Sequence, residues 1–173
     1  MKISQEGNTV ILEDIKHFNP KHIFECGQCF RWIKQEDDSY TGVAMGKVIN
    51  VKQDGNKIYL DNTTKEDFDN IWYDYFDLGR DYEEMVNTLK VMDEYLEKAT
   101  EFGEGIRILK QDGWEMLISF IISANNRIPM IQRAINNLSK NYGTYIGEYK
   151  GQEYYAFPTS EQLSKASVEE IRA

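Results

Sequence analysis

Two cysteines separated by two residues form the first candidate for chemistry. Cys26 and Cys29 enclose Gly27 and Gln28, and such a C-x-x-C pair can serve as a redox dithiol or as half of a zinc site. A redox dithiol usually opens a helix whose N-terminus stabilises the thiolate. The residues that follow here, FRWI at 30–33, are typical of a strand. The redox interpretation is therefore disfavoured.

A zinc site would need two further ligands, and His17 and His22 precede the cysteines. All four residues fall within thirteen positions, without the hairpin and helix that normally separate two ligand pairs. We favour a simpler interpretation, in which Cys26 and Cys29 are small, half-buried residues where a strand begins and both histidines lie on the surface. A zinc-binding interaction module stays open as an alternative, but we expect neither a metal nor a cofactor.

A polar loop between two predicted helices is the second candidate. Asn125, Asn126 and Arg127 follow an apolar helix and precede an amphipathic one. Capping the two helices is the more common role for such side chains. Side chains at a rigid helix junction are also well placed to enter a disturbed DNA duplex. The sequence shows neither a Ser/His/Asp arrangement nor a phosphate-binding glycine loop.

The elements that must position these residues change type near residue 63. Before it, short β-rich runs alternate with Asp, Gly and Asn clusters, which predicts an antiparallel sheet with strands at 8–13, 29–34, 39–45, 47–53 and 57–62. Asp54-Gly55-Asn56 predicts a hairpin between the last two. After Thr63 the apolar period becomes about 3.6, which predicts helices at 64–76, 81–100, 113–124 and 129–142.

The predicted helix at 113–124 is unusually apolar. Only Glu115, Ser119 and Ser123 are polar, in a narrow stripe, so we expect burial nearly all round. A loop rich in Gly and Tyr follows at 144–157, then a short helix after Pro158 and the start of another at 168–173. Because a helix of one turn is marginal, we expect the end of this sequence to be a fragment boundary.

Charge neither supports nor excludes a nucleic-acid partner. The net charge is −9, which by itself argues against phosphate binding. Residues 61–100 hold twelve acidic and four basic residues, whereas residues 1–60 hold eight of each. The acidity is thus concentrated in one stretch, interpreted as a solvated helical face turned away from a polyanion. No apolar run is long enough for a membrane helix, and the N-terminus does not resemble a secretion signal.

Several of these residues together resemble the 8-oxoguanine DNA glycosylase family. The stretch CGQCFRW at 26–32 is similar to the family's G-Q-x-F-R-W motif, where a strand begins. GIRILKQD at 105–112, with SFIISANN at 119–126, is similar to its helical segment and S-x-N-N loop, and YAFP at 155–158 is a third match. The matches follow family order from about residue 23 onward.

The resemblance implies an α+β fold and a base-flipping repair enzyme. It implies an N-terminal antiparallel β-sheet domain with flanking helices at 1–100, followed at 101–173 by the start of an all-helical glycosylase domain of the helix-hairpin-helix type. The partner would be double-stranded DNA containing 8-oxoguanine, bound by a monomer, in the cytoplasm at the nucleoid if the protein is bacterial. The fragment would contain no catalytic residue, because the family's lysine nucleophile and catalytic aspartate belong beyond Ala173. A non-enzymatic binding domain is the rival class.

The resemblance also assigns roles to individual residues. Gly27 would read the lesion through its carbonyl, with Gln28 and Phe30 also in the substrate site. The predicted DNA contacts are Asn125, which fills the space left by the flipped base, Asn126, Arg127 and Met130. Met130 stands where better-known eukaryotic relatives have an arginine that reads the opposite cytosine. We therefore expect a relaxed preference for the opposite base.

Overall fold

The chain packs as two compact units in a computed structural model that describes residues 1–172. The first unit comprises Met1–Gln28, Lys34–Tyr40 and Asn50–Lys110. The second comprises Cys29–Ile33, Thr41–Ile49 and the described residues from Gln111 onward. The division at residue 100 inferred from the sequence stays a prediction, since these units follow different boundaries.

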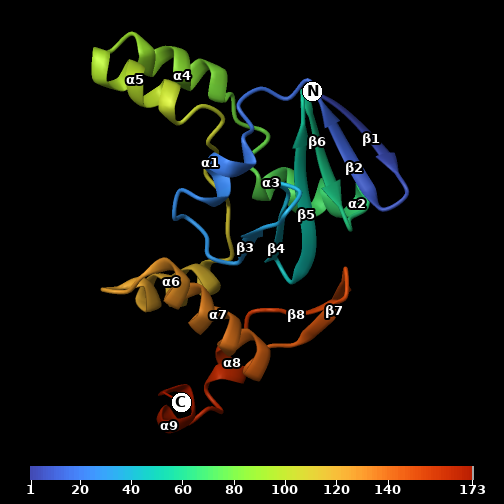
Figure 1. Cartoon of the computed structure of the whole chain (residues 1–173), viewed down its shortest axis with the longest axis vertical. Coiled ribbons are helices and arrows are strands. Elements are labelled where there is room, and N and C mark those ends of the chain that lie inside the picture. Colours follow the sequence, from blue (N-terminus) through green and yellow to red (C-terminus); the bar gives the residue numbers. More distant parts are fainter. Residues whose placement is uncertain (173) are drawn as a thin grey trace. The chain divides into compact units, whose positions relative to one another are not determined.

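The predicted antiparallel sheet is confirmed, with one additional strand (Figure 1). Its order is β1-β2-β6-β5-β4-β3. The strands are β1 Lys2–Glu6, β2 Thr9–Glu13, β3 Trp32–Lys34, β4 Tyr40–Ala44, β5 Lys47–Asp54 and β6 Lys57–Asp61. The strand β1 was not predicted, because its residues KISQE lie mostly exposed and carry no apolar alternation. It forms through backbone pairing with β2, from Lys2 opposite Glu13 to Glu6 opposite Thr9.

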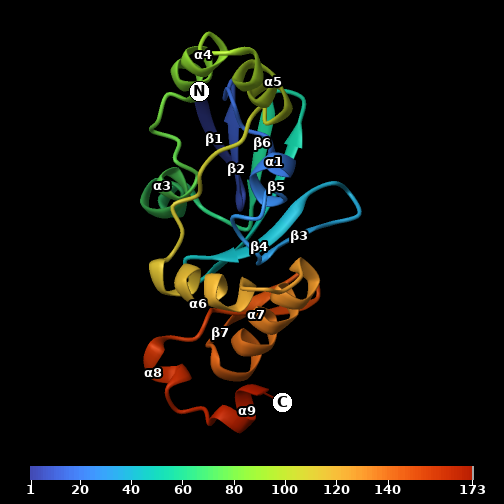
Figure 2. The same ribbon diagram turned by 90° about the vertical axis from the view of Figure 1, so that its left-hand side faces the viewer.

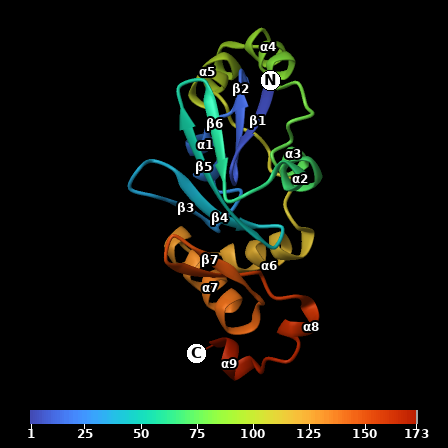
Figure 3. The same cartoon turned by 90° about the vertical axis from the view of Figure 1, so that its right-hand side faces the viewer.

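The hairpin predicted at Asp54-Gly55-Asn56 joins β5 to β6. Asp54 pairs with Lys57, so Gly55 and Asn56 form a two-residue turn. Gly55 has a φ of +58°, the left-handed conformation in which a glycine avoids the strain that a side chain would add. Figure 3 shows β6 running between β5 and β2. The local turn chemistry therefore determines the register of this pair.

The core of the first unit combines sheet residues with aromatic side chains from the helices. Val10 and Leu12 on β2 and Leu60 on β6 are fully buried, as are Phe68 and Trp72. The Trp72 indole Nε1 donates to Thr63 Oγ1 at 2.7 Å, so its polar atom is satisfied inside the core. The sequence predicted strands with an apolar period of two and a helix with a period of about 3.6. The apolar residues of both thus pack into one core.

The helical segments of the first unit are α1 Pro20–Phe24, α2 Lys65–Asp67, the π-helical turn η1 Phe68–Trp72, α3 Tyr73–Tyr75, α4 Tyr82–Lys90 and α5 Glu94–Phe102. Among them, α1, α2, α4 and α5 begin at side-chain caps, whereas η1 and α3 continue directly from the turn before them. Thr64 accepts from the backbone N–H of Asp67 at 3.1 Å, as its sequence position predicted. The expectation of one helix over 81–100 was wrong. Asp93 accepts from the N–H of Tyr95 and Leu96, so a second helix begins there and α4 and α5 form a hairpin (Figure 1).

The second unit carries the remaining helices (Figure 2) and a small hairpin (Figure 1). Its elements are α6 Gly113–Ser123, α7 Ile128–Tyr142, β7 Tyr145–Tyr149, β8 Gln152–Tyr155, α8 Ser160–Leu163 and α9 Val168–Arg172. The helices agree with the sequence prediction, but the expected loop at 144–157 is a hairpin. Tyr145 pairs with Tyr155, and a turn at Lys150 and Gly151, both with positive φ, joins the strands. Tyrosine favours strands, but the glycines in this segment had led to the prediction of a loop.

The expectation that α6 is buried nearly all round was wrong. Phe120 is 73% exposed and Ile121 is 59% exposed, whereas Ser119 is buried. Glu115, also on the polar stripe, has a side chain only 22% exposed because it pairs with Arg31. Within the described residues the polar stripe is thus the better covered side. Composition measures how apolar a helix is, but its neighbours decide which side is covered.

Candidate nucleic-acid interface

Gly27 presents its backbone to solvent a few residues after α1. The residue is exposed and has a φ of +85°, a conformation that side chains other than glycine rarely adopt. A Cβ built at this position would have nothing within 4 Å. The glycine is therefore required by backbone conformation and not by crowding. The open space at Gly27 leaves its main chain accessible to a ligand.

The side chain of Gln28, next in the chain, is held by backbone groups on both sides. Its Nε2 donates to the carbonyl of Ile23 at 2.9 Å and to the carbonyl of Arg107 at 2.8 Å. Its Oε1 accepts from the N–H of Leu109 at 2.9 Å. The substrate contact inferred for Gln28 stays a prediction. In this structure the amide links the 26–28 turn to the segment at 105–110.

The Arg107 side chain fixes that segment from the inside. Arg107 is 4% exposed, and its guanidinium donates to the carbonyls of His17 at 2.6 Å, Asp77 at 2.9 Å and Lys16 at 3.0 Å. It lies over the ring of Tyr82, 4.5 Å from the ring centroid. Burial lowers the pKa of Arg107, opposed by the charges of Tyr82 and Asp77. The sequence motif contained Arg107, but only the tertiary contacts show this role.

Asp77 and Tyr82 complete this buried polar cluster. Tyr82 donates its hydroxyl to Asp77 Oδ2 at 2.9 Å and accepts from the N–H of Ile108 at 2.9 Å. Burial alone would raise the pKa of Asp77, but hydrogen bonds from Tyr82 and Lys110 hold it below its ordinary value. Asp77 therefore stays ionised and holds both neighbours in place. The cluster stabilises residues 105–110, which Gln28 contacts.

Phe30 and Arg31 belong to the second unit. Phe30 is half-buried, and its predicted contact with a base stays a prediction. Arg31 is buried, with its Nη1 3.7 Å from Glu115 Oε2, and it donates to the carbonyl of Tyr155. Burial raises the pKa of Glu115, and the attraction of Arg31 opposes that rise only in part. Arg31 thus joins three elements of this unit, a structural role that its place in the sequence motif did not reveal.

The two asparagines of the loop between α6 and α7 have different roles. Asn126 donates its Nδ2 to the carbonyl of Ile122 at 3.3 Å and accepts from the N–H of Arg127 at 2.8 Å. The bond to Ile122 caps the last turn of α6, whereas α7 has no side-chain cap among the described residues. Asn125 is exposed with a φ of +54°, and its amide makes no hydrogen bond with any other described residue. The loop therefore presents Asn125 at its outer side while Asn126 holds the turn.

The residues after this loop are also displayed. Arg127 is exposed at the N-cap position of α7, and Met130 is 52% exposed one turn later. Ile128 between them is likewise 52% exposed. A cation, two apolar side chains and an amide therefore lie together at one end of α7. This combination can approach a phosphate backbone and stack against bases.

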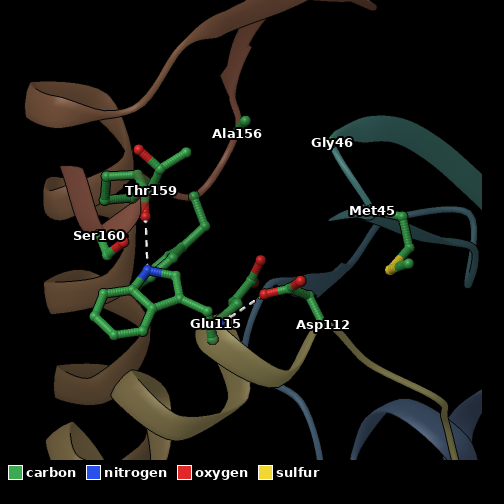
Figure 4. Close-up of a pocket in the computed structure, with 10 residues that line it drawn as sticks. Met45, Gly46, Asp112, Glu115, Ala156, Thr159 and Ser160 are labelled. Atoms are coloured by element: carbon green, nitrogen blue, oxygen red, sulfur yellow. Dashed lines mark hydrogen bonds between the residues drawn. The ribbon is translucent and has the colours of Figure 1, made fainter. Parts of the chain in front are cut away.

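A pocket of about 460 Å³ lies in the second unit and is distinct from these residues (Figure 4). Asp112 and Glu115 from the start of α6 face Thr159 and Ser160 at α8, with Met45 and Gly46 on a further side (Figure 4). Asp112 accepts from the N–H of Glu115 at 2.8 Å, a capping bond. None of the predicted site residues lines the pocket. Asp112 and Thr159 are engaged as helix caps, and Glu115 pairs with Arg31.

The four residues of the zinc alternative show ordinary local contacts. Cys26 is exposed and Cys29 is buried, and both are free thiols. His22 places Nδ1 2.7 Å from the carbonyl of Glu104. Within residues 1–172 no group of three or more His, Cys, Asp or Glu side chains could hold a metal ion. The zinc alternative therefore gains no geometric support. Among the helices of the same residues, none is long and apolar enough to span a membrane.

The comparisons with known proteins indicate the same family. Residues 10–117 match the family described as 8-oxoguanine DNA glycosylase, N-terminal domain. The chain is 33% identical over 162 residues to the N-glycosylase/DNA lyase of Saccharomyces cerevisiae, covering 86% of this chain and 43% of that protein. The chain thus spans less than half of this relative.

Solved structures extend the likeness over nearly the whole chain. The 8-oxoguanine glycosylase/lyase of Clostridium acetobutylicum, in complex with double-stranded DNA containing cytosine opposite 8-oxoG, is 47% identical with a TM-score of 0.95. The match covers 99% of this chain and 59% of that one. MBOgg1, solved with a low-affinity DNA ligand, is 52% identical with a TM-score of 0.94, covering 98% of this chain and 58% of that one. With its sheet order, its glycine turn and its asparagine loop, this chain belongs to the 8-oxoguanine DNA glycosylase N-terminal domain family.

Proposed function

We propose that this chain is the N-terminal part of an 8-oxoguanine DNA glycosylase and lyase acting on double-stranded DNA. The observation that carries the proposal is Gly27, a solvent-facing glycine with a left-handed backbone and open space around it. A flipped base can approach such a main chain without meeting a side chain. The DNA complex of the Clostridium relative supports the same partner.

The Gly27 carbonyl would distinguish the oxidised base by one proton. Guanine carries a lone pair at N7, whereas 8-oxoguanine carries N7–H, which a carbonyl oxygen can accept. Normal guanine would set two acceptors against each other, at a cost of about 1 to 3 kcal/mol for an unmade buried hydrogen bond. Recognition would therefore depend on one backbone oxygen, and Phe30 would also contact the substrate.

The loop at the start of α7 would hold the opened duplex. Asn125 is displayed without a described hydrogen-bond partner, which suits a side chain that fills the space left by a flipped base. Asn126 would hold the turn from which Asn125 projects, and Arg127 would contact the phosphate backbone. Met130 cannot donate a hydrogen bond to the opposite base. The preference for that base would therefore be relaxed.

The chemistry would come from residues outside this sequence. The relatives are longer than this chain, which covers 58–59% of the two solved proteins. The exposed apolar side of α6, with Phe120 and Ile121, supports a helical domain that continues from 101–173 and covers it. The lysine nucleophile and catalytic aspartate of the family would lie there. The protein would act as a monomer without cofactor and, if it is bacterial, in the cytoplasm at the nucleoid.

Two assays test the proposal. The full-length protein should excise 8-oxoguanine from a duplex and leave guanine, in single-turnover reactions with excess enzyme. The 173-residue chain alone should neither excise the base nor form a borohydride-trapped DNA adduct, because the nucleophile is missing. A trapped adduct with the 173-residue chain would contradict the proposal that the catalytic residues lie outside this sequence. A full-length protein inert toward 8-oxoguanine would contradict the activity itself.

A further inference from the structure

Gln28 lies between the proposed lesion reader and the rest of the first unit. We propose that Gln28 is a positioning residue that sets the place of the Gly27 carbonyl, and thereby the discrimination between 8-oxoguanine and guanine. This rests on the function proposed above. It replaces a direct substrate contact of the Gln28 side chain with an indirect role.

The hydrogen bonds of Gln28 use both ends of its amide. The Nε2 group has two hydrogens, and it donates to two carbonyls, those of Ile23 and Arg107. Oε1 accepts from the N–H of Leu109. All three partners are backbone groups, so a change of side chain at those positions cannot remove them. Gln28 is thus tied to α1 on one side and to the 105–110 segment on the other.

The 105–110 segment is itself held firmly at both ends. The N–H of Asn19 donates to the carbonyl of Gly105 at 2.8 Å, and the N–H of Lys110 donates to the carbonyl of Tyr75 at 2.9 Å. Between them the buried Arg107 guanidinium donates to three carbonyls. A displacement of this segment would break several buried hydrogen bonds at once. Gln28 therefore bonds to a fixed surface.

Within residues 1–172, Gly27 has no comparable attachment of its own. It lacks a side chain, it is exposed, and its left-handed backbone has open space around it. Its carbonyl belongs to the peptide that joins it to Gln28, so the place of Gln28 governs the direction of that oxygen. A single acceptor can separate N7–H from a lone pair only while it is held close to one position. The Gln28 amide supplies that constraint.

The first test measures discrimination in the full-length protein. Gln28→Ala should lower the ratio of 8-oxoguanine to guanine excision about tenfold, equivalent to roughly 1.4 kcal/mol. Affinity for a duplex with an abasic site should change by less than about twofold, since no base is read there. A merely structural role would lower both quantities together. Gln5→Ala is the matched control, because Gln5 also bonds two backbone groups, the Gly7 carbonyl and the Lys65 N–H, and is exposed elsewhere.

A conservative variant adds a pH dependence. In Gln28→Glu the carboxylate can still accept from Leu109, but it faces the carbonyls of Ile23 and Arg107 with no proton to donate. Protonation restores one donor. The discrimination of Gln28→Glu should therefore recover as the pH falls from about 8 to about 5, relative to the wild type at each pH. A ratio to wild type that stays flat would contradict the positioning role.

The second test needs no catalysis and also uses the full-length protein. In Gln28→Ala the backbone NMR order parameter of Gly27 should fall from near 0.85, typical of a rigid backbone, toward 0.6. In Gln5→Ala it should stay unchanged. An unaltered Gly27, or unaltered discrimination in Gln28→Ala, would overturn the inference while leaving the proposed function intact. A wild-type protein that excises both bases equally would overturn both.

Discussion

The Arg31 guanidinium lies 3.7 Å from the Glu115 carboxylate, and the two side chains are only 7% and 22% exposed. Arg31 comes directly before the Trp32 that begins β3, and Glu115 comes from the first turn of α6. Because both charges are largely removed from water, each depends on the other for stabilisation. The pair explains why Glu115, on the polar stripe of α6, is covered.

The first prediction concerns pH. Burial raises the pKa of Glu115, so the folded protein holds that proton more tightly than the unfolded chain. The free energy of unfolding should therefore fall as the pH rises from about 4.5 through the raised pKa of Glu115, and level off above it. Glu115→Gln removes this contribution. Urea unfolding of both proteins from pH 4 to 8 measures it, and a wild-type minus variant difference independent of pH would contradict it.

The second prediction concerns the loss of the cation. Arg31→Met should lower the free energy of unfolding by about 3 kcal/mol, because it leaves the Glu115 carboxylate poorly solvated and unpaired. The double variant Arg31→Met with Glu115→Met should recover part of the loss. Lys34→Met is the control: Lys34 pairs with Asp38 at 2.8 Å, but both side chains are exposed. Its urea midpoint should stay nearly unchanged, and an equal loss in the two single variants would refute the argument from burial.

The third prediction separates strain from recognition at Gly27. Gly27→Ala and Gly55→Ala both place a Cβ on a left-handed backbone with open space, so each should destabilise the protein by about 1 kcal/mol. Only Gly27→Ala should weaken 8-oxoguanine excision by the full-length protein, because the added methyl group meets the approaching base. Thermal unfolding and single-turnover rates are the measurements. Equal activity of the two variants would show that Gly27 does not contact the substrate base.

The fourth prediction concerns the base opposite the lesion. The full-length wild-type protein should excise 8-oxoguanine at similar rates opposite C, A, G and T, since Met130 is 52% exposed and cannot donate a hydrogen bond. Met130→Arg should raise the preference for cytosine several-fold, because arginine can donate to that base. Met130→Leu, which keeps the apolar character, is the control. Strict cytosine preference in the wild type would show that other residues read this base.

The fifth prediction tests the core of the first unit. Thr63→Val leaves the buried Trp72 indole N–H without its acceptor, now 2.7 Å away, and should cost about 1 to 3 kcal/mol. Thr88→Val makes the same chemical change on the exposed surface of α4, where Thr88 bonds the carbonyl of Glu84. That control should stay within about 0.5 kcal/mol of wild type. Chemical denaturation compares them, and equal effects would show that the indole bond contributes little.

The sequence alone determined the features that depend on near neighbours. The hairpin at Asp54-Gly55-Asn56 follows from a glycine that tolerates a left-handed backbone, and α2 begins where Thr64 can cap it. On β6 the buried Ile58 and Leu60 alternate with less buried neighbours, as the period of two in a strand predicts. The motif around Gly27 and the loop at Asn125 pointed to the family, which the comparisons confirm. These signals need only a few consecutive residues.

Only the tertiary structure decided the features that depend on distant partners. Gln28 bonds to groups 79 and 81 residues away, and nothing in its local sequence identifies Arg107 and Leu109 as those groups. The polar β1 becomes a strand because β2 offers it backbone partners. Glu115, on the polar side of α6, is covered because it meets Arg31. In each case the energy comes from a contact between segments that the chain brings together only on folding, so spacing along the sequence could not predict it.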